Sequence, residues 1–130
     1  MPVQSEEYTE LAQEVIQEKP DLEWLTKADV SIAFMRSDKE KKSKGKLVFG
    51  ECILVNELYK SFCPYDFLIV IYEQNISELS RDQVKILLYH ELLHVGVDEK
   101  NGQLKKRIVP HDIEDFRKII DQYGIDWAVS

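Results

Sequence analysis

The clearest pattern in the chain is a run of apolar residues with helical spacing. Ser80, followed three residues later by Gln83, forms the signature of a capping box ahead of this run. Gly96 follows the last apolar position and is expected to end the helix in the left-handed conformation. Charged residues are rare in the middle of the segment, so the helix should be buried at the centre of the fold. The pattern predicts a helix over residues 81–95.

Two further helices are expected, one towards each end of the chain. Ser5 can cap the first, which runs to about Glu18 before Pro20 prevents its continuation. Asp112 can cap the last, which Gly124 ends. Each has an apolar face, made of Tyr8, Leu11, Ala12, Val15 and Ile16 in the first and of Ile113, Phe116, Ile120 and Tyr123 in the last.

Three segments have the patterns of β-strands. Residues 30–36 alternate between apolar and polar, residues 46–55 form a longer strand, and the continuously apolar residues 67–72 predict a strand covered on both faces. Gly50, inside the second strand, indicates a bulge or a close approach of the backbone to another group. Asn101-Gly102 is a strong turn signal and predicts a short hairpin after the buried helix.

Together these elements predict an α+β fold in one domain over residues 1–130. We expect a small three-stranded, mainly antiparallel sheet. An N-terminal helix, the central buried helix, the short hairpin and a C-terminal helix complete the expected fold.

The composition limits the partners that the chain can bind. Its net charge of −7 argues against a general nucleic-acid surface, because phosphate binding needs a basic face. The exception is the segment 39–46, called the lysine loop below. Its five lysines could meet a phosphate backbone or an acidic substrate, but such a run is more typical of an exposed hairpin tip.

The sequence also predicts a compartment. No apolar run approaches the roughly 20 residues that span a bilayer, and the first residues lack the basic and apolar regions of a signal peptide. We therefore expect a cytoplasmic protein without a membrane partner, in which Cys52 and Cys63 are reduced thiols.

The central helix carries His90-Glu91-Leu92-Leu93-His94, which matches the H-E-x-x-H signature of zinc hydrolases. Histidines four residues apart lie on the same helix face, where both can bind one Zn²⁺ ion. Glu91 lies beside them and is placed to act as general base on a zinc-bound water. A chance match would leave a carboxylate buried without compensation between two histidines, which is unfavourable.

A catalytic zinc ion needs three protein ligands and one open position. His111 is the remaining histidine of the three in the sequence, and it lies just before the predicted last helix. We favour it as the third ligand. Glu114 is the first alternative, and Asp112 is the second, although Asp112 is better placed as a helix cap or as a partner of a ligand histidine.

With these residues in place, the chain resembles the phage metallopeptidases, a family of small zincins similar in layout to SprT-like proteins. The resemblance covers about residues 30–127. It is carried by the His90–His94 motif, the Gly50-Glu51 strand, the Pro110-His111-Asp112-Ile113-Glu114-Asp115-Phe116 segment and the ending Tyr123-Gly124-Ile125-Asp126-Trp127. It implies a minimal zincin-like fold and a zinc-dependent peptidase, with His90, His94 and His111 as ligands and Glu91 as catalytic acid and base.

The residues and the resemblance together predict hydrolysis of a peptide or protein substrate. A second electrophile is expected beside the metal, and Tyr59, Tyr65 and Tyr72 are the candidates. The alternative is a zinc-stabilised module that binds protein or nucleic acid without catalysis. The carboxylate of Glu91 favours the enzyme, because a purely structural site has no use for it. A phage protease that cleaves repressors is a narrower form of the enzyme hypothesis.

Overall fold

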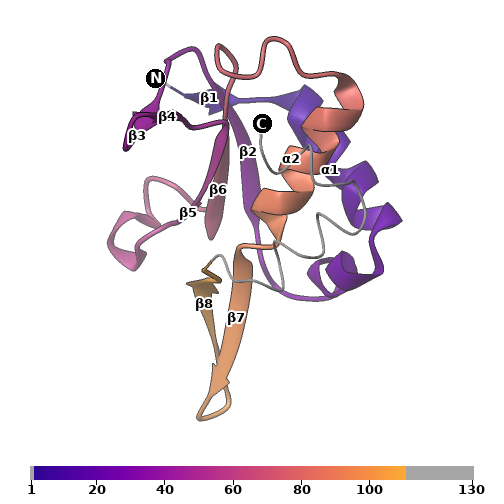
Figure 1. The fold of residues 1–130 in the computed structure, drawn as a ribbon. Helices are drawn as coiled ribbons and strands as arrows, with labels where there is room; N and C mark the ends of the chain where they lie inside the picture. Colours follow the sequence, from indigo (N-terminus) through magenta and orange to yellow (C-terminus); the bar gives the residue numbers. More distant parts are fainter. Residues whose placement is uncertain (1, 111–130) are drawn as a thin grey trace.

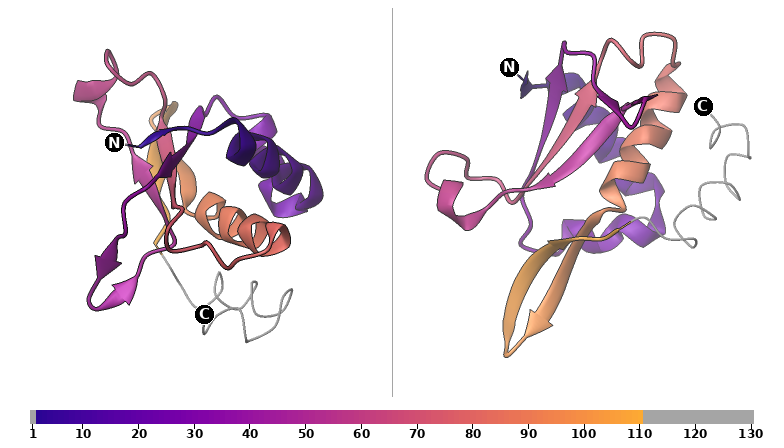
Figure 2. Two further views of the ribbon diagram at one scale, coloured as in Figure 1. Left: turned by 90° about the horizontal axis from the view of Figure 1, so that it is seen from above. Right: turned by 60° about the vertical axis from the view of Figure 1, so that its left-hand side comes forward.

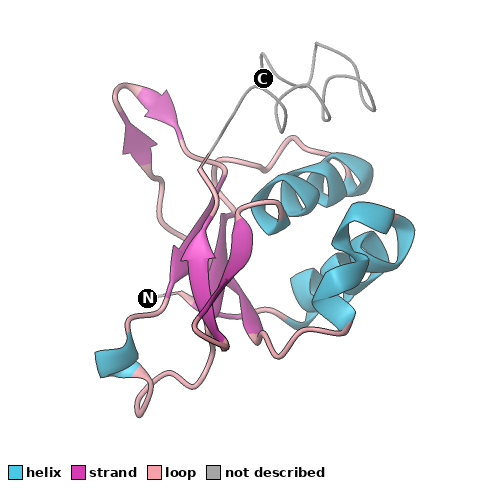
Figure 3. Ribbon diagram, turned by 90° about the horizontal axis from the view of Figure 1, so that it is seen from below, coloured by secondary structure: helices cyan, strands magenta, loops and turns pink. Residues whose placement is uncertain are grey.

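The computed structural model describes residues 2–110 of the 130-residue chain and has two layers. A four-stranded sheet forms one layer, and helical segments cover one of its faces (Figure 1 and Figure 3). These segments are α1 (Glu6–Glu18), the 3-10 helix η1 (Pro20–Thr26) and α2 (Arg81–Leu92). Buried apolar side chains from the helices and from the sheet form one core between the layers. The fold is thus mixed helix and sheet, as the sequence predicted.

The order of the sheet is β1-β2-β6-β5, in which β2 and β6 run parallel and the outer strands run antiparallel to their neighbours. The strands are β1 (Val3–Gln4), β2 (Ile32–Ser37), β5 (Gly50–Leu54) and β6 (Phe67–Tyr72). The sheet therefore has four strands where three were expected, but it is mainly antiparallel as predicted, because two of its three pairings are antiparallel. The short β1 is added, and β6 lies between β2 and β5 and runs parallel to β2. Apolar patterns locate strands along the chain but do not set their order.

Helix α1 begins and ends where the sequence predicts. Ser5 is the N-cap, and its hydroxyl oxygen accepts a hydrogen bond from the Tyr8 N–H at 3.1 Å. Lys19 is the C-cap, and Pro20 opens η1. The buried residues of α1, which face α2 and β2, are Tyr8, Leu11, Ala12 and Val15.

The start of α2 confirms the predicted capping box. The Gln83 N–H donates to Ser80 Oγ at 3.2 Å, and the Ser80 N–H donates to Gln83 Oε1 at 2.8 Å. The helix is largely buried, as expected, through Val84, Leu87, Leu88, Tyr89, Glu91 and Leu92.

The predicted end of this helix is wrong. α2 ends at Leu92, and strand β7 begins at Val95. Gly96 lies in β7, and the positive-φ glycines of the described part of the chain lie elsewhere, in hairpin turns. A Cβ atom added to Gly96 would lie 2.6 Å from Val109 Cγ2. The glycine therefore allows close packing against Val109 and does not terminate the helix.

Two hairpins extend from the body of the fold. β7 (Val95–Lys100) and β8 (Gln103–Ile108) are joined by Asn101 and Gly102, whose φ angles of 52° and 77° confirm the predicted tight turn. The lysine loop forms the other hairpin, from β3 (Lys42–Ser43) and β4 (Lys46–Leu47). It projects from the side of the sheet away from the helices (Figure 2). The strand expected over residues 46–55 is thus divided into β4 and β5.

Three further expectations concern the C-terminal helix, membrane-spanning segments and the two cysteines. The predicted C-terminal helix, with Asp112 as its N-cap, lies outside the described residues. Within residues 2–110, no helix combines the length and the apolar character needed to cross a membrane. Cys52 and Cys63 are free cysteines.

Candidate metal centre

The two histidines of the motif come together where α2 ends. His90 lies in the last turn of α2, and His94 follows the last helical residue, Leu92, by two positions. The His94 N–H donates to the Glu91 carbonyl at 3.1 Å, so the chain makes one tighter turn at this point. The two imidazole rings meet edge to face, with centroids 5.1 Å apart and planes at 83°. Rings this close can offer nitrogens to a single metal ion.

Val109 sets the orientation of the His94 ring. His94 Nδ1 lies 2.6 Å from the Val109 carbonyl oxygen, and the Val109 N–H donates to the His94 carbonyl at 2.7 Å. Because a carbonyl oxygen can only accept, Nδ1 carries the proton and the lone pair is on Nε2. A histidine that binds a metal through Nε2 typically has such a backbone partner at Nδ1.

Glu91 is buried between α2 and β5. Only 6% of the residue is exposed, and a Cβ atom added to Gly50 would lie 3.4 Å from Glu91 Cγ. The same Cβ atom would lie 3.3 Å from Ile71 Cδ1 and from the Val70 carbonyl oxygen, so the glycine packs closely against β6 and against the Glu91 methylene group, which confirms the close approach predicted for it. A buried carboxylate needs positive charge or hydrogen bonds to compensate it. A cation held by the neighbouring histidines would supply that charge.

The pKa of Glu91 reflects this position. Burial raises the pKa of Glu91 from 4.5 to about 8, and the negative charge of Glu51 adds to the rise. In the metal-free protein the carboxyl group is therefore largely protonated at neutral pH. A cation bound beside it would have the opposite effect and favour the carboxylate.

For the metal-free protein we predict that stability falls as the pH rises. An acid whose pKa is raised by folding stabilises the protein fully below its unfolded pKa, near 4.5, and loses that contribution as the pH rises to about 8. Urea titrations of the chelated chain at several pH values should show this fall, at most about 1.4 kcal/mol per pH unit from this group. The Glu91→Gln variant should show a flatter profile, and parallel profiles would contradict the burial of an ionisable group here.

A second carboxyl group, Glu51, lies on the other face of β5. It accepts hydrogen bonds from Lys41 and from the Tyr72 hydroxyl. Successive strand residues point to opposite faces, so Glu51 points away from α2 where Gly50 points towards it. Burial alone would raise the pKa of Glu51, but the hydrogen bonds from Lys41 and Tyr72 outweigh burial and hold that pKa below its usual value. Glu51 is therefore charged.

Glu51 was not predicted to carry a role of its own, and Lys41 was considered only as one of the five lysines of the lysine loop. Lys41 lies in the lysine loop, ten positions before Glu51. Nothing in the local pattern indicates that this loop folds back onto β5. The sequence did contain one relevant signal. Because Glu51 directly follows Gly50 in a predicted strand, its side chain points to the opposite face of the sheet from the one that Gly50 presents to the helices.

The three tyrosines proposed as electrophiles lie in different places. Tyr59 belongs to the 3-10 helix η2 (Glu57–Tyr59) and is 60% exposed. The Tyr65 hydroxyl accepts a hydrogen bond from Gln4 Nε2 at 2.9 Å. Tyr72 is buried at the end of β6, and its hydroxyl donates to Glu51.

The predicted third ligand, His111, and its alternatives, Asp112 and Glu114, lie outside the described residues. Within residues 2–110, no three His, Cys, Asp or Glu side chains form a group that could hold a metal ion. Cys52, on β5, has a pKa raised to about 12 by burial and then by the charge of Glu91, so its thiol is neutral. The described part of the site is thus two histidines and a buried glutamate.

A helix that ends in two adjoining imidazoles, with a buried carboxyl group between them in sequence, is typical of metal-dependent hydrolases. The chain belongs to the family described as "Putative phage metallopeptidase", whose model matches residues 2–129. This match confirms the resemblance found in the sequence and covers nearly the whole chain. No curated protein and no solved structure matches the chain. The family is one of metallopeptidases, which implies a metal cofactor, typically zinc, and a protein or peptide substrate.

Proposed function

We propose that the protein is a zinc-dependent peptidase in which His90, His94 and His111 bind the metal and Glu91 transfers protons. The observation that carries this proposal is the burial of Glu91 beside two adjoining imidazoles. Glu91 is 6% exposed, and its charged form destabilises the fold unless a bound cation or a substrate compensates the buried charge.

The described donors suit zinc. Imidazole nitrogen is a common zinc ligand, with Zn–N distances of about 2.0–2.1 Å. The hydrogen bond from His94 Nδ1 to Val109 selects the tautomer with its lone pair on Nε2. The edge-to-face packing of His90 and His94 brings the two rings within reach of one ion.

The connection to His111 supports it as the third ligand. Both backbone groups of Val109 interact with His94, and His111 follows Val109 by two residues. Two peptide units span at most about 7 Å, so a chain leaving Val109 can return an imidazole to this site. Glu114 and Asp112 follow in the same segment and are the alternatives.

In the proposed hydrolysis the metal and the side chains have separate roles. Zinc, when bound, supplies a Lewis acid that activates water and polarises the carbonyl group of the substrate. Glu91 accepts a proton from the attacking water and returns it to the leaving amine. Its burial excludes bulk water, which strengthens these electrostatic interactions. The Tyr72 hydroxyl donates to Glu51 on the far face of the sheet, and the Tyr65 hydroxyl is hydrogen-bonded to Gln4 of β1, at the sheet edge opposite β5. Tyr59 is then the remaining candidate for a second electrophile.

The substrate is expected to lie extended along β5. Among the described residues β5 pairs on one side only, with β6, so its outer edge can accept the backbone of a peptide. Gly50 adjoins Glu91 at one end of this strand. A peptide added to the edge would pass the carboxyl group that moves the proton.

Metal removal tests the proposal. The zinc-loaded chain should cleave a protein substrate such as unfolded casein, chelation should abolish cleavage, and added zinc should restore it. Gel and mass-spectrometric analysis of the products measures the effect. A chain that binds zinc but cleaves neither casein nor a random peptide library would contradict the peptidase and favour the zinc-stabilised binding module.

A further inference from the structure

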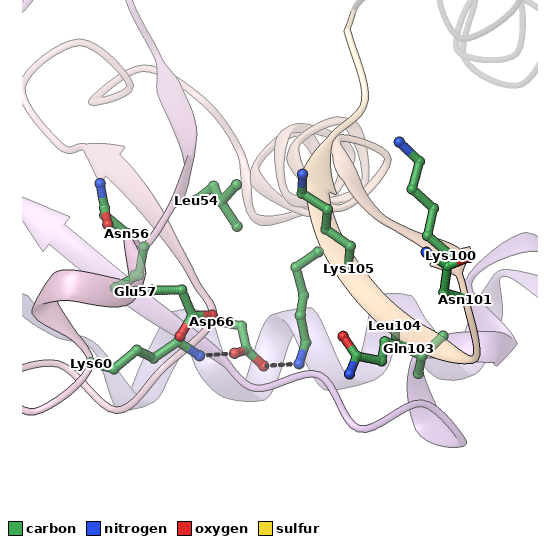
Figure 4. A pocket seen from close by; sticks show the side chains of 12 residues that line it. Leu54, Asn56, Glu57, Lys60, Asp66, Lys100, Asn101, Gln103, Leu104 and Lys105 are labelled. Carbon is green, nitrogen blue, oxygen red and sulfur yellow. Dashed lines mark hydrogen bonds and ion pairs between the residues drawn. The ribbon is translucent and has the colours of Figure 1, made fainter.

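A pocket lies between β5 and the β7–β8 hairpin, away from the two histidines of the motif. Its volume is about 560 Å³, and it is bounded by the end of β5, by η2 and by the turn of the hairpin (Figure 4). Its charged lining residues are Glu57, Lys60, Asp66, Lys100, Lys105 and Lys106. Four positive charges and two negative ones give this pocket a net positive charge, although the whole chain carries −7.

The charges within the pocket are not equivalent. Asp66 is 6% exposed, and it pairs with Lys60 and, at 3.8 Å, with Lys106. Figure 4 shows Lys60 directed at Asp66. The Ser31 N–H also donates to Asp66 at 3.0 Å, so this acid is fully compensated inside the fold. Asp66 thus anchors two of the four lysines.

Lys100 and Lys105 lie on the hairpin strands at the rim of the same pocket, and their ammonium groups point away from Asp66 (Figure 4). Both are exposed, and within residues 2–110 the structure shows no ion pair at either of them. Their charges are therefore available to a ligand. Leu54 and Leu104, which are 38% and 52% exposed, add apolar surface to the walls. A ligand with acidic groups and some apolar surface fits this combination.

We propose that this pocket binds acidic side chains of the substrate peptide, so that the enzyme prefers peptides with glutamate or aspartate several residues from the cleaved bond. This inference rests on the proposed peptidase function. The geometry that carries it is the course of β5, which begins at Gly50, against Glu91, and ends at Leu54, in the pocket wall.

The length of β5 sets the position of the preferred residue. A strand rises about 3.3 Å per residue, so the four steps from Gly50 to Leu54 span about 13 Å. A peptide lying along the outer edge keeps the same rise. Its side chain in the pocket is therefore about four residues from the bond beside Glu91.

A peptide suits the pocket better than a nucleic acid does. Single-stranded nucleic acids are bound by stacking on aromatic side chains along a continuous basic groove. The lining residues include no aromatic side chain, and Glu57 and Asp66 interrupt the positive charge. Separate carboxylates on a peptide can meet Lys100 and Lys105 while the rest of the chain avoids these acids.

Binding of two fluorescent decapeptides tests this specificity. One carries glutamate at alternate positions in a serine and valine background, and the other carries glutamine there. Fluorescence anisotropy is measured with the zinc-loaded Glu91→Gln chain, so that cleavage does not interfere. The glutamate peptide should bind about fivefold to tenfold more tightly at low salt, since exposed ion pairs are individually weak.

Lys100→Gln with Lys105→Gln should reduce this preference to less than about twofold. The matched control is Lys39→Gln with Lys46→Gln, which removes the same charge from exposed positions on the lysine loop and should keep the preference. Equal binding of the two peptides, or a preference that survives the first pair of substitutions, would overturn the proposal. So would a ten-nucleotide oligothymidylate that binds more tightly than the glutamate peptide and loses affinity in the same variant.

Cleavage by the unsubstituted chain separates this inference from the proposed function. Faster cleavage of the glutamate peptide supports both. Cleavage of both peptides at equal rates overturns the acidic specificity while the peptidase stands. Cleavage of neither, with the binding preference intact, overturns the peptidase and the role of the pocket in substrate choice.

Discussion

Replacing Glu91 with glutamine should leave zinc bound and lower the rate of peptide hydrolysis by at least about 10²–10⁴-fold, which is the range of general acid–base catalysis. Glutamine has nearly the shape of glutamate and fits the same buried space beside Gly50, but it cannot accept the proton of the attacking water. The effect should appear in kcat, because the side chain assists the transition state more than substrate binding. Steady-state kinetics and zinc analysis of the same preparation measure both parts.

Glu51→Gln is the matched control for this substitution. It removes a carboxylate from the neighbouring strand, on the face that points away from α2, where Glu51 binds Lys41 and Tyr72. Hydrolysis should fall by less than about tenfold, because this group touches neither substrate nor metal in our proposal. Glu91→Gln enzyme that keeps more than a tenth of the native rate would exclude Glu91 as the proton acceptor.

Replacing His94 with alanine should abolish both zinc binding and hydrolysis. The substitution removes one proposed ligand, and it also removes the side-chain hydrogen bond to Val109, whose carbonyl lies 2.6 Å from Nδ1. Losing one of three ligands should weaken zinc affinity by several orders of magnitude, because structural and catalytic zinc sites depend on their full ligand set. Elemental analysis should find about one zinc per native chain and almost none in the variant. Thermal unfolding should no longer respond to added zinc.

Two further variants show whether this loss is specific. Cys52→Ala removes a thiol on β5, and thiolates are common zinc ligands. This variant should keep zinc, because the Cys52 thiol is neutral and packs against the core. His111→Ala should lose zinc as His94→Ala does. If His111→Ala keeps zinc and Glu114→Gln loses it, the third ligand is Glu114. Zinc that is kept in His94→Ala would contradict the site.

The local signals in the sequence predicted local structure well. The capping box of Ser80 and Gln83, the cap at Ser5 and the turn at Asn101 each depend on residues a few positions apart, and the structure contains all three. Gly50 was also informative, because a glycine inside a strand pattern indicates close packing, and its close neighbours are Ile71, Val70 and Glu91.

The features that the sequence did not predict depend on contacts between distant segments. Strand β6 lies between β2 and β5, and its parallel pairing with β2 joins segments that are about 30 residues apart in the chain. α2 ends at Leu92 because the chain turns into β7, where Gly96 packs against Val109. No short window of sequence shows the pairing of Lys41 with Glu51. The same is true of the pocket whose lysines come from the hairpin and from the residue that follows η2.

Anomalous diffraction at the zinc edge, from crystals of the zinc-loaded chain, locates the metal ion without any assumption about its ligands. We expect one zinc ion bound by ring nitrogens of His90 and His94 at about 2.0–2.1 Å, with His111 as the third protein ligand and the carboxyl group of Glu91 beside the open position. An ion bound elsewhere, or an anomalous map without a peak between the two motif histidines, would contradict this expectation.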